Sequence, residues 1–473
     1  MKKVLAIICA ALCSLGLKAQ INFPPTEYYA LEQNDIDRAE SLLDTPLKKP
    51  LEYPNPSKGA QWFPDASLGL FMHWGIHSML GAQPSWAMIN HYRYNGGYKS
   101  KELYYSQALR FNPEFNADKY LHAAKEAGFN YAVLTTRHHD GYCLWPSKYG
   151  IGTKQFMGGR DLIKEYVEAC HRAGLRVGLY YSPRDWLYPG TYDEKHFDTD
   201  TRGQIEGIKD PVERQNEYVR MLGYVMAQIE ELLTNYGRID VLWLDGMDMI
   251  GITDHHNDQV YAWIRSLQPD IVINDRWSNI VNPDNPDGTS IRLGDFTTPF
   301  ECQKPTYSPS KWWEHCHIWT CGGGGWGYDK TGTFRPMSWF FDEYVASRSL
   351  GGNFLPNASP DGNGNMHPNF YKQIDSLKSW MSHSGESLNG AGPTPGTRLS
   401  NVPLTTQGKK IWYAHVLPSF KGQISVLTNK KPKSVTLLRT GAPIIYEYAC
   451  GAVIFKLPLA ARTQTDDAVK INL

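Results

Sequence analysis

The regular alternation of short apolar runs with amphipathic stretches constrains the fold of this chain more than any other feature. It extends from about residue 60 to residue 380, and the longer stretches carry apolar residues at i, i+3 and i+4, which is typical of half-buried helices. Such helices are predicted at Ala117–Ala127, Asp161–Ala173 and Gln215–Asn235. The runs between them predict strands at Gly69–His73, Tyr131–Thr136, Arg176–Ser182, Asp240–Asp245, Ile271–Asp275, Ser290–Asp295, Cys316–Thr320 and Asn353–Asn357.

Strands that alternate with helices favour a parallel sheet, and this number of strands favours a closed (β/α)8-like barrel. An open doubly wound sheet is the alternative, but no glycine-rich phosphate loop follows the first strand. The region 290–320 leaves little room for helices between its strands. The length of 473 residues fits one large barrel with an appendage.

The segments that flank the barrel have a different texture. Residues 20–58 are polar and contain several prolines, which indicates an N-terminal lead-in segment with one helix around 34–43. After Trp380 comes a stretch rich in Gly, Pro and Ser, followed by alternating runs separated by turn residues. We therefore expect the (β/α)8-like barrel domain at 59–383 and a small C-terminal β-sandwich domain at 384–473, with strands at Lys410–Val416, Gln423–Leu427, Ser434–Leu438 and Val453–Leu457.

The first residues have the pattern of an export signal. Lys2 and Lys3 precede the apolar run Val4–Leu17, and the small residue Ala19 stands at the expected cleavage site. The run is too short to span a membrane. We expect a signal peptide at 1–19, a soluble mature chain that starts near Gln20 and is periplasmic or secreted, and no later membrane span.

Six cysteines follow the predicted signal, and their spacing shows no dense disulfide framework. An exported chain permits disulfides. Cys316 and Cys321 are close enough in sequence to pair, but buried free thiols are the expected state for most of the six.

The charge balance argues against a nucleic-acid partner, because Lys+Arg and Asp+Glu both number 48. The 15 Trp and 28 Tyr are a large aromatic complement. Aromatic side chains fill ordinary cores, and they also supply the flat faces on which sugar rings stack. Composition alone leaves both explanations open.

Polar residues gather where the predicted strands end. In a barrel the C-terminal strand ends converge on one face, where active sites form. The segments are Phe71-Met72-His73-Trp74-Gly75, Thr136-Arg137-His138-His139-Asp140-Gly141, Tyr180-Tyr181-Ser182, Trp243-Leu244-Asp245-Gly246 and Asn274-Asp275-Arg276-Trp277. Neighbours on a strand face opposite ways, so we expect only one of His138 and His139 to point inward. Asp245-Gly246 taken alone is equally a plain turn signal.

A retaining glycosidase needs one carboxylate as nucleophile and a second carboxyl group as acid/base, about 5–5.5 Å away. Asp245 suits the first role, because Arg276 or a nearby His would keep it ionised. Glu301 is the first candidate for the second role and Glu314 the next. A solvated surface residue is the ordinary fate of either Glu.

Taken in order, these segments resemble the α-L-fucosidase family of retaining glycoside hydrolases. The resemblance extends from about Trp62 to Glu386. Beyond the strand ends above, it rests on Trp62-Phe63, Leu70, Tyr142, Trp326-Gly327-Tyr328, Gly352-Asn353-Phe354-Leu355 and Pro360-Asp361-Gly362.

The resemblance implies a (β/α)8-like catalytic domain, a C-terminal β-sandwich, no metal and no organic cofactor. It implies hydrolysis of terminal α-L-fucosyl residues from fucosylated oligosaccharides or glycoconjugates, through a covalent intermediate on Asp245. The family's acid/base Glu follows the Asp-Arg-Trp segment at a variable distance, where Glu301 lies. The positions that match substrate-binding residues are His73, Trp74, His138, His139, Tyr181, Arg276 and Trp326.

Three departures from the family pattern keep alternatives open. Phe300 intervenes in the usual Thr-Pro-Glu, the loop 81–86 lacks the usual Trp-Tyr-rich pattern, and the segment 314–321 with its four following glycines is atypical. L-Galactose differs from L-fucose only by a hydroxyl on C6, which an apolar pocket cannot strongly reject. An α-L-galactosidase and a non-catalytic fucose-binding relative are therefore alternatives. A metal-dependent hydrolase fits poorly, because His73 and His77 lack the His-x-His spacing of such barrels.

Overall fold

The barrel predicted from the sequence is present. The computed structural model describes residues 26–89, 97–188, 208–245, 257–278 and 293–473. Eight parallel strands form one sheet in the order β7-β6-β5-β2-β1-β10-β9-β8, and a bridge between Asn274 and Phe296 joins its two edges. The strands are β1 (Gly69–Met72), β2 (Tyr131–Arg137), β5 (Arg176–Tyr181), β6 (Val241–Leu244), β7 (Val272–Ile273), β8 (Phe296–Thr297), β9 (Trp312–Ile318) and β10 (Asn353–Asn357).

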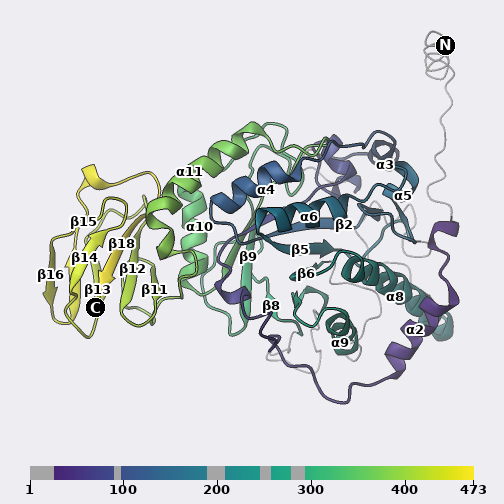
Figure 1. Cartoon of the computed structure of the whole chain (residues 1–473), viewed down its shortest axis with the longest axis horizontal. Helices are drawn as coiled ribbons and strands as arrows, with labels where there is room; N and C mark the ends of the chain where they lie inside the picture. The colour runs from purple at the N-terminus through teal and green to yellow at the C-terminus, as the bar shows by residue number, and fades with distance from the viewer. Residues whose placement is uncertain (1–25, 90–96, 189–207, 246–256, 279–292) are drawn as a thin grey trace, which may run out of the picture.

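Helices cover the outside of the barrel (Figure 1). The helix α6 (Leu162–Ala173) shows why these segments are helical, since the Asp161 carboxylate accepts the Lys164 N–H at its start and Gly174 ends it with a φ of 70°. The other helices are α2 (Gln33–Asp44), α3 (Lys101–Ser106), α4 (Ala117–Glu126), α5 (Thr153–Phe156), α8 (Pro211–Thr234), α9 (Asn257–Leu267), α10 (Met337–Ser349) and α11 (Pro368–Ser384). Short 3-10 turns are η1 (Thr26–Tyr29), η2 (Phe63–Asp65), η3 (Ile76–Met79), η4 (Trp86–Met88), η5 (Gln107–Leu109), η7 (Arg276–Ser278), η8 (Gly385–Ser387) and η9 (Leu459–Ala461).

The strand predicted at Ser290–Asp295 is wrong for the residues that the structure describes, because the sixth barrel strand, β8, begins at Phe296. Residues 290–292 lie outside the described ranges. Asp295 instead turns its buried carboxylate to the backbone, accepting the Asn55 N–H at 2.7 Å and the Ile273 N–H at 2.8 Å. No helix lies between β8 and β9 within the described residues 298–311, as the sequence there suggested.

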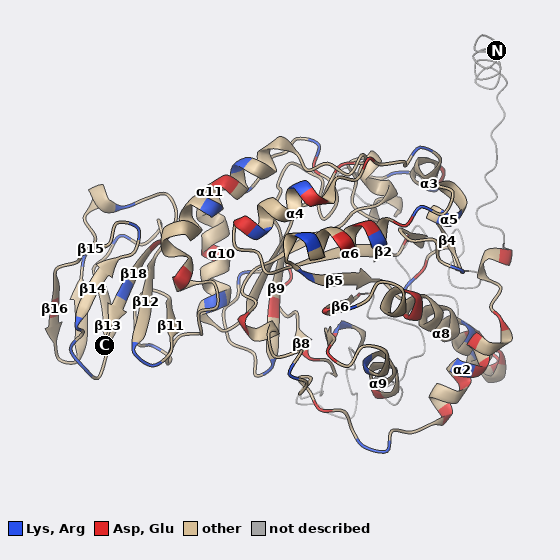
Figure 2. Ribbon diagram, in the orientation of Figure 1, with Lys and Arg blue, Asp and Glu red and all other residues tan. Residues whose placement is uncertain are grey.

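Side chains alternate between the barrel interior and the helical layer along each strand. The interior cluster includes Phe71, Val133, Tyr180, Trp243 and Leu355, and Ala60, Phe63 and Ala66 of the preceding segment pack against it. The larger outer cluster joins the other strand faces to the helices. Figure 2 shows acidic and basic residues interspersed along the outer helices α4, α6 and α11, in keeping with the balanced charge.

The C-terminal region is the predicted β-sandwich, at the yellow end of Figure 1. A five-stranded antiparallel sheet (β11-β12-β18-β14-β15) faces a three-stranded one (β13-β17-β16) over a small apolar core. Trp380 of α11 donates its indole N–H to the Asp466 carbonyl at 2.7 Å, which ties the sandwich to the barrel. The strands are β11 (Leu404–Gln407), β12 (Ile411–Val416), β13 (Ile424–Leu427), β14 (Ser434–Leu437), β15 (Ala442–Pro443), β16 (Tyr446–Ala449), β17 (Ala452–Phe455) and β18 (Asp467–Asn472), and a separate pair is β3 (Tyr142–Cys143) with β4 (Ile151–Gly152).

The remaining predictions about the chain have mixed outcomes. The predicted lead-in helix is present as α2, whose Arg38 forms an ion pair with Glu230 of α8. The predicted signal peptide at 1–19 lies outside the described residues. The six cysteines after it are all free thiols, so Cys316 and Cys321 are not paired. Among the described residues no helix combines the length and the apolar character needed to span a membrane.

Candidate active site

Asp245 stands at the mouth of the barrel, directly after β6. The side-chain amide of Asn274 binds both the N–H and the carbonyl of Leu244 at 2.9 Å, and the Asp245 N–H donates to the Tyr181 carbonyl at 3.1 Å. These bonds continue the sheet past the strand end and fix the backbone that carries the carboxylate. The Asp245 side chain is 18% exposed, so it is accessible to a small ligand while largely enclosed.

Tyr180 and Arg276 both contact the Asp245 carboxylate. The Tyr180 hydroxyl donates to Oδ2 at 2.7 Å, and Arg276 Nη2 lies 3.2 Å from Oδ1. The Arg276 guanidinium also lies over the Trp243 ring, 4.7 Å from its centroid. A hydrogen-bond donor and a cation both favour the ionised form of a carboxyl group.

Arg276 also contacts Glu301, on the loop after β8, with 2.7 Å between Nη1 and Oε2. Burial alone would lower the pKa of Arg276, and Asp245 and Glu301 together reverse this and raise it. One guanidinium thus connects the two candidate carboxyl groups. The Glu301 side chain is 40% exposed, so it can turn toward a ligand.

Glu314, the second candidate for the acid/base, lies elsewhere. It is fully buried on β9 inside the barrel, where it accepts hydrogen bonds from the Tyr131 hydroxyl and from Trp243 Nε1, the latter at 2.9 Å. Burial raises the pKa of Glu314 to about 7. Tyr131 is the first residue of β2, so this carboxyl group lies toward the N-terminal strand ends and away from the mouth.

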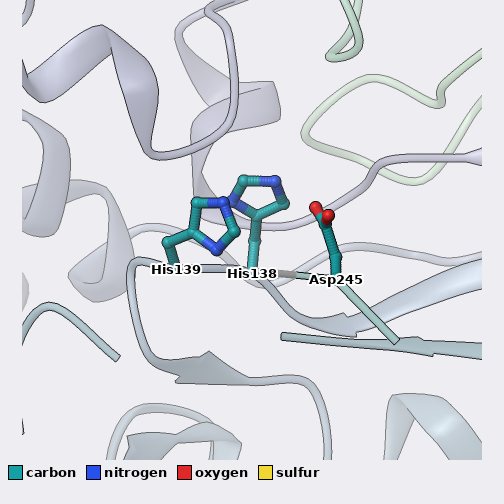
Figure 3. Close-up of side chains that lie close together, drawn as sticks. All are labelled: His138, His139 and Asp245. Carbon is teal, nitrogen blue, oxygen red and sulfur yellow. The ribbon is translucent and has the colours of Figure 1, made fainter. Parts of the chain in front are cut away.

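The expectation that only one of His138 and His139 points inward is wrong. The pairing of β2 with β5 shifts between Thr135 and Arg137, and β2 ends at Arg137. Both histidines therefore lie beyond the strand, where strict alternation no longer applies. Figure 3 shows the two imidazoles with Asp245 beside them, and one ligand atom from each of the three residues lies within 4.8 Å of the others.

All three predicted histidines are buried and neutral. Burial lowers the pKa of His73 to about 4 and that of His139 to about 3, and it lowers the pKa of His138 well below the ordinary value. The His73 ring lies 5.1 Å from that of Trp326, which is on the loop after β9. The mouth thus combines neutral imidazoles with an aromatic face.

Tyr180 was not among the residues predicted to bind substrate. The predicted substrate-binding residue Tyr181 instead faces the helices, where its hydroxyl donates to Gln228 at 2.9 Å. Tyr180 belongs to the interior cluster, and its ring stacks on His138 with centroids 5.5 Å apart. Strand alternation separates the two tyrosines, but the sequence does not say which of them faces inward.

Trp74, predicted as a substrate-binding residue, does not line the mouth. Its indole N–H donates to the Asp361 carbonyl at 2.8 Å, and its ring stacks on Phe115 with centroids 4.3 Å apart. The side chain is buried in the outer cluster. The structure therefore places Trp74 behind the mouth, not in it.

The trio of His138, His139 and Asp245 is also the one group among the described residues with the spacing to hold a metal ion. Chemically, the mouth offers a carboxylate paired with a cation, a second carboxyl group that is 40% exposed, and neutral imidazoles that can bind hydroxyl groups. A nucleophile, a proton donor and hydroxyl-binding groups are what glycoside cleavage requires.

Comparisons with known proteins agree with this chemistry. The family model "Alpha-L-fucosidase" matches residues 39–386. The chain is 27% identical to the tissue α-L-fucosidase of Mus musculus, over 70% of this chain and 72% of the relative. A solved structure of α-L-fucosidase isoenzyme 1 from Paenibacillus thiaminolyticus has a TM-score of 0.71 and 28% identity, covering 88% of this chain and 99% of that one. An α-L-fucosidase from Bacteroides thetaiotaomicron, solved as a trapped covalent intermediate, shares the fold with a TM-score of 0.73 and 22% identity, covering 91% and 99% of the two chains.

Proposed function

The chain belongs to the α-L-fucosidase family of glycoside hydrolases, and on that premise we propose that it is a retaining exo-glycosidase with Asp245 as its nucleophile and Glu301 as its acid/base. Its substrate is a terminal α-L-fucosyl residue of an oligosaccharide or glycoconjugate. The observation that carries the assignment of these two residues is the Arg276 guanidinium, which contacts both carboxyl groups.

The first step is displacement at the anomeric carbon. An Asp245 carboxylate oxygen bonds to C1 while the bond from C1 to the leaving oxygen breaks, and the Glu301 proton moves to that oxygen. In the second step Glu301 takes a proton from water, the water oxygen bonds to C1, and the Asp245 carboxylate is released. Two displacements at C1 restore the original anomeric configuration.

Arg276 has different consequences for the two carboxyl groups. Its charge suits the nucleophile, which must be ionised, whereas the acid/base must face the glycosidic oxygen to pass its proton to it. Glu301 therefore exchanges its contact with Arg276 for the glycosidic oxygen when the substrate binds. The 40% exposure of its side chain leaves room for this movement.

Binding of the sugar falls to the side chains around the carboxylate. His73, His138 and His139 bind hydroxyl groups, and Trp326 offers an aromatic face beside His73. The alternative of an α-L-galactosidase is not favoured, since the family and the curated relatives are named for fucose.

The test is a panel of aryl glycosides with the α-L-fucoside, the α-L-galactoside and the β-D-galactoside, followed by trapping of the covalent intermediate. We expect the fucoside to be turned over fastest and the label to be on Asp245. Asp245→Ala should lose nearly all turnover on every substrate. Glu301→Ala should lose about 10²–10⁴-fold on natural glycans and far less on the aryl fucoside, whose leaving group needs little acid help.

Each assignment can fail separately in this experiment. Near-normal turnover by Asp245→Ala would contradict the nucleophile. An unchanged rate of Glu301→Ala on a natural glycan would contradict the acid/base. Binding of fucose without any turnover of the aryl fucoside would support the non-catalytic alternative.

We also propose that the chain is exported. The support is the pattern of residues 1–19, with two lysines, an apolar run and Ala19 before Gln20. Sequencing the N-terminus of the protein recovered from a periplasmic or culture fraction tests this, and an intact Met1 there would contradict cleavage.

A further inference from the structure

The two adjacent histidines of the mouth bind two serines that have opposite hydrogen-bond surroundings. His138 Nδ1 lies 2.6 Å from Ser85 Oγ, and His139 Nδ1 lies 2.6 Å from Ser182 Oγ. Both imidazoles are neutral, so each carries a single N–H proton, on Nδ1 or on Nε2. The partners of each serine decide which nitrogen carries it.

Ser182 has only one hydrogen to donate. Its hydroxyl reaches the Arg184 carbonyl at 3.1 Å, and a carbonyl oxygen can only accept. The contact between Ser182 Oγ and His139 Nδ1 therefore takes its hydrogen from the imidazole. His139 carries its proton on Nδ1, and its Nε2 is an acceptor.

Ser85 is in the reverse situation. Its Oγ accepts the backbone N–H of Asp140 at 2.8 Å, so its own hydrogen remains to be donated. Ser85 is fully buried, so this hydrogen needs an acceptor. Among the described residues His138 Nδ1 is the acceptor within reach. His138 therefore carries its proton on Nε2, which is a donor.

The backbone at Ser85 is strained in the conformation that brings its hydroxyl group to His138. Ser85 has a φ of 53° and a ψ of −54°, and the Trp86 N–H donates to the Pro84 carbonyl across it. This is close to the γ-turn with positive φ, which is rare and strained for a residue with a side chain. The buried Tyr104 hydroxyl holds the turn by accepting the Ser85 N–H at 2.9 Å and donating to Asp140 at 2.6 Å.

We propose that Ser85 and Ser182 are positioning residues that hold His138 and His139 in opposite tautomers, so that the pair presents one donor and one acceptor to the sugar. The inference deepens the proposed function. Their ring centroids are 4.2 Å apart, and one ring nitrogen of each lies within 4.8 Å of the other. One hydroxyl group between them would accept from His138 Nε2–H and donate to His139 Nε2. A metal ion bound by both histidines would need a lone pair on Nε2 of each. In this arrangement only His139 Nε2 has one, so the trio with Asp245 is suited to a hydroxyl group.

The direct test is ¹⁵N NMR of the full-length protein labelled at histidine, since the nitrogen shifts distinguish a protonated from a bare ring nitrogen. Signals are assigned by their loss in His138→Gln and His139→Gln. We expect the proton on Nε2 of His138 and on Nδ1 of His139. The same tautomer for both histidines would overturn the proposal.

Matched serine variants test the cause. Ser85→Ala should release the tautomer of His138 and leave that of His139, and Ser182→Ala should do the reverse. Ser85→Gly tolerates the positive φ, so agreement between it and Ser85→Ala separates loss of the hydroxyl from backbone strain. Tautomers that do not move in any of the three variants would contradict the roles of the serines.

A substrate test uses aryl α-L-fucosides with one ring hydroxyl at a time replaced by fluorine, which can accept weakly but cannot donate. At one of the ring positions, the loss of kcat/KM on fluorination should be about tenfold smaller in Ser182→Ala than in the native enzyme. If fluorination lowers kcat/KM by the same factor in Ser182→Ala and in the native enzyme at every ring position, the proposed bridging hydroxyl group is wrong. The NMR result needs no turnover, so an inactive enzyme with opposite tautomers would refute the proposed function alone.

Discussion

The mouth of the barrel and its interior both hold carboxyl groups, but they stabilise them in different ways. At the mouth, Asp245 and Glu301 share the cation Arg276 and keep contact with solvent. In the interior, Glu314 is fully buried and accepts hydrogen bonds from the neutral donors Tyr131 and Trp243. At the mouth a cation compensates the negative charge of the carboxyl groups. In the interior, burial favours the uncharged form of Glu314.

On the proposed assignment, a raised pKa alone does not identify the acid/base. Glu314 has the raised pKa expected of a proton donor, at about 7. It nevertheless lies where no sugar can reach it. Position at the C-terminal strand ends and access to the ligand separate Glu301 from Glu314, although both are glutamates that follow the Asp-Arg-Trp segment.

Among the substitutions considered for this comparison, removal of the shared cation Arg276 should lower activity most. In Arg276→Met the two carboxyl groups lose their common partner, so the aryl fucoside should be turned over with kcat/KM lower by about 10²–10³-fold. Arg335→Met is the matched control, because Arg335 also lies over a tryptophan ring, Trp339 at 5.0 Å, but its hydrogen bond goes to the Ile318 carbonyl. Equal losses in the two variants would mean that the shared contact has no special role.

The two neighbouring tyrosines of β5 give a smaller and sharper comparison. Tyr180→Phe removes the donor to Asp245 and should lower kcat/KM about tenfold with little change in melting temperature. Tyr181→Phe removes a bond to Gln228 in the helical layer, so it should lower stability and leave kcat/KM within about threefold. The reverse outcome would show that the inward-facing tyrosine is Tyr181.

Much of the fold follows from periodicity, because a strand or helix must match the spacing of its apolar residues to the core. This holds for Asn353–Asn357, predicted and observed with the same bounds. It fails at 293–295, the described part of the strand predicted at 290–295, where the Asp295 carboxylate accepts hydrogen bonds from backbone N–H groups. The strand β8 has two residues and follows a buried aspartate, so it has too few apolar residues to show the alternation expected of a strand.

The sequence predicted which strand ends form the site. It did not predict which individual side chains point into it. The irregular pairing of β2 after Thr135 lets both His138 and His139 reach the mouth, which alternation alone forbids. Trp74 lies one residue past His73 and stacks on Phe115 on the other side of the wall. Such outcomes depend on pairing between strands that are distant in sequence, which one segment does not encode.

The interior carboxyl group should affect turnover least and stability most clearly. In Glu314→Gln the amide oxygen still accepts from Trp243, and the amide N–H₂ can donate to the Tyr131 hydroxyl. Turnover should therefore stay within about threefold of the native rate, since Glu314 does not contact the mouth. A loss comparable to that of Glu301→Ala on a natural glycan would instead assign the acid/base role to Glu314.

The pH dependence of unfolding tests the same residue by its charge. Burial raises the pKa of Glu314 from 4.5 to about 7, so the folded state binds this proton more tightly than the unfolded state. The resulting stability is complete below pH 4.5 and is lost as the pH rises through 7, which amounts to about 3 kcal/mol. Glu314→Gln has no such proton, so the variant should gain stability relative to the native protein between pH 4.5 and 7.5 in urea unfolding. A difference that stays constant over this range would mean that the interior tolerates the ionised carboxylate, and the contrast with the mouth would fail.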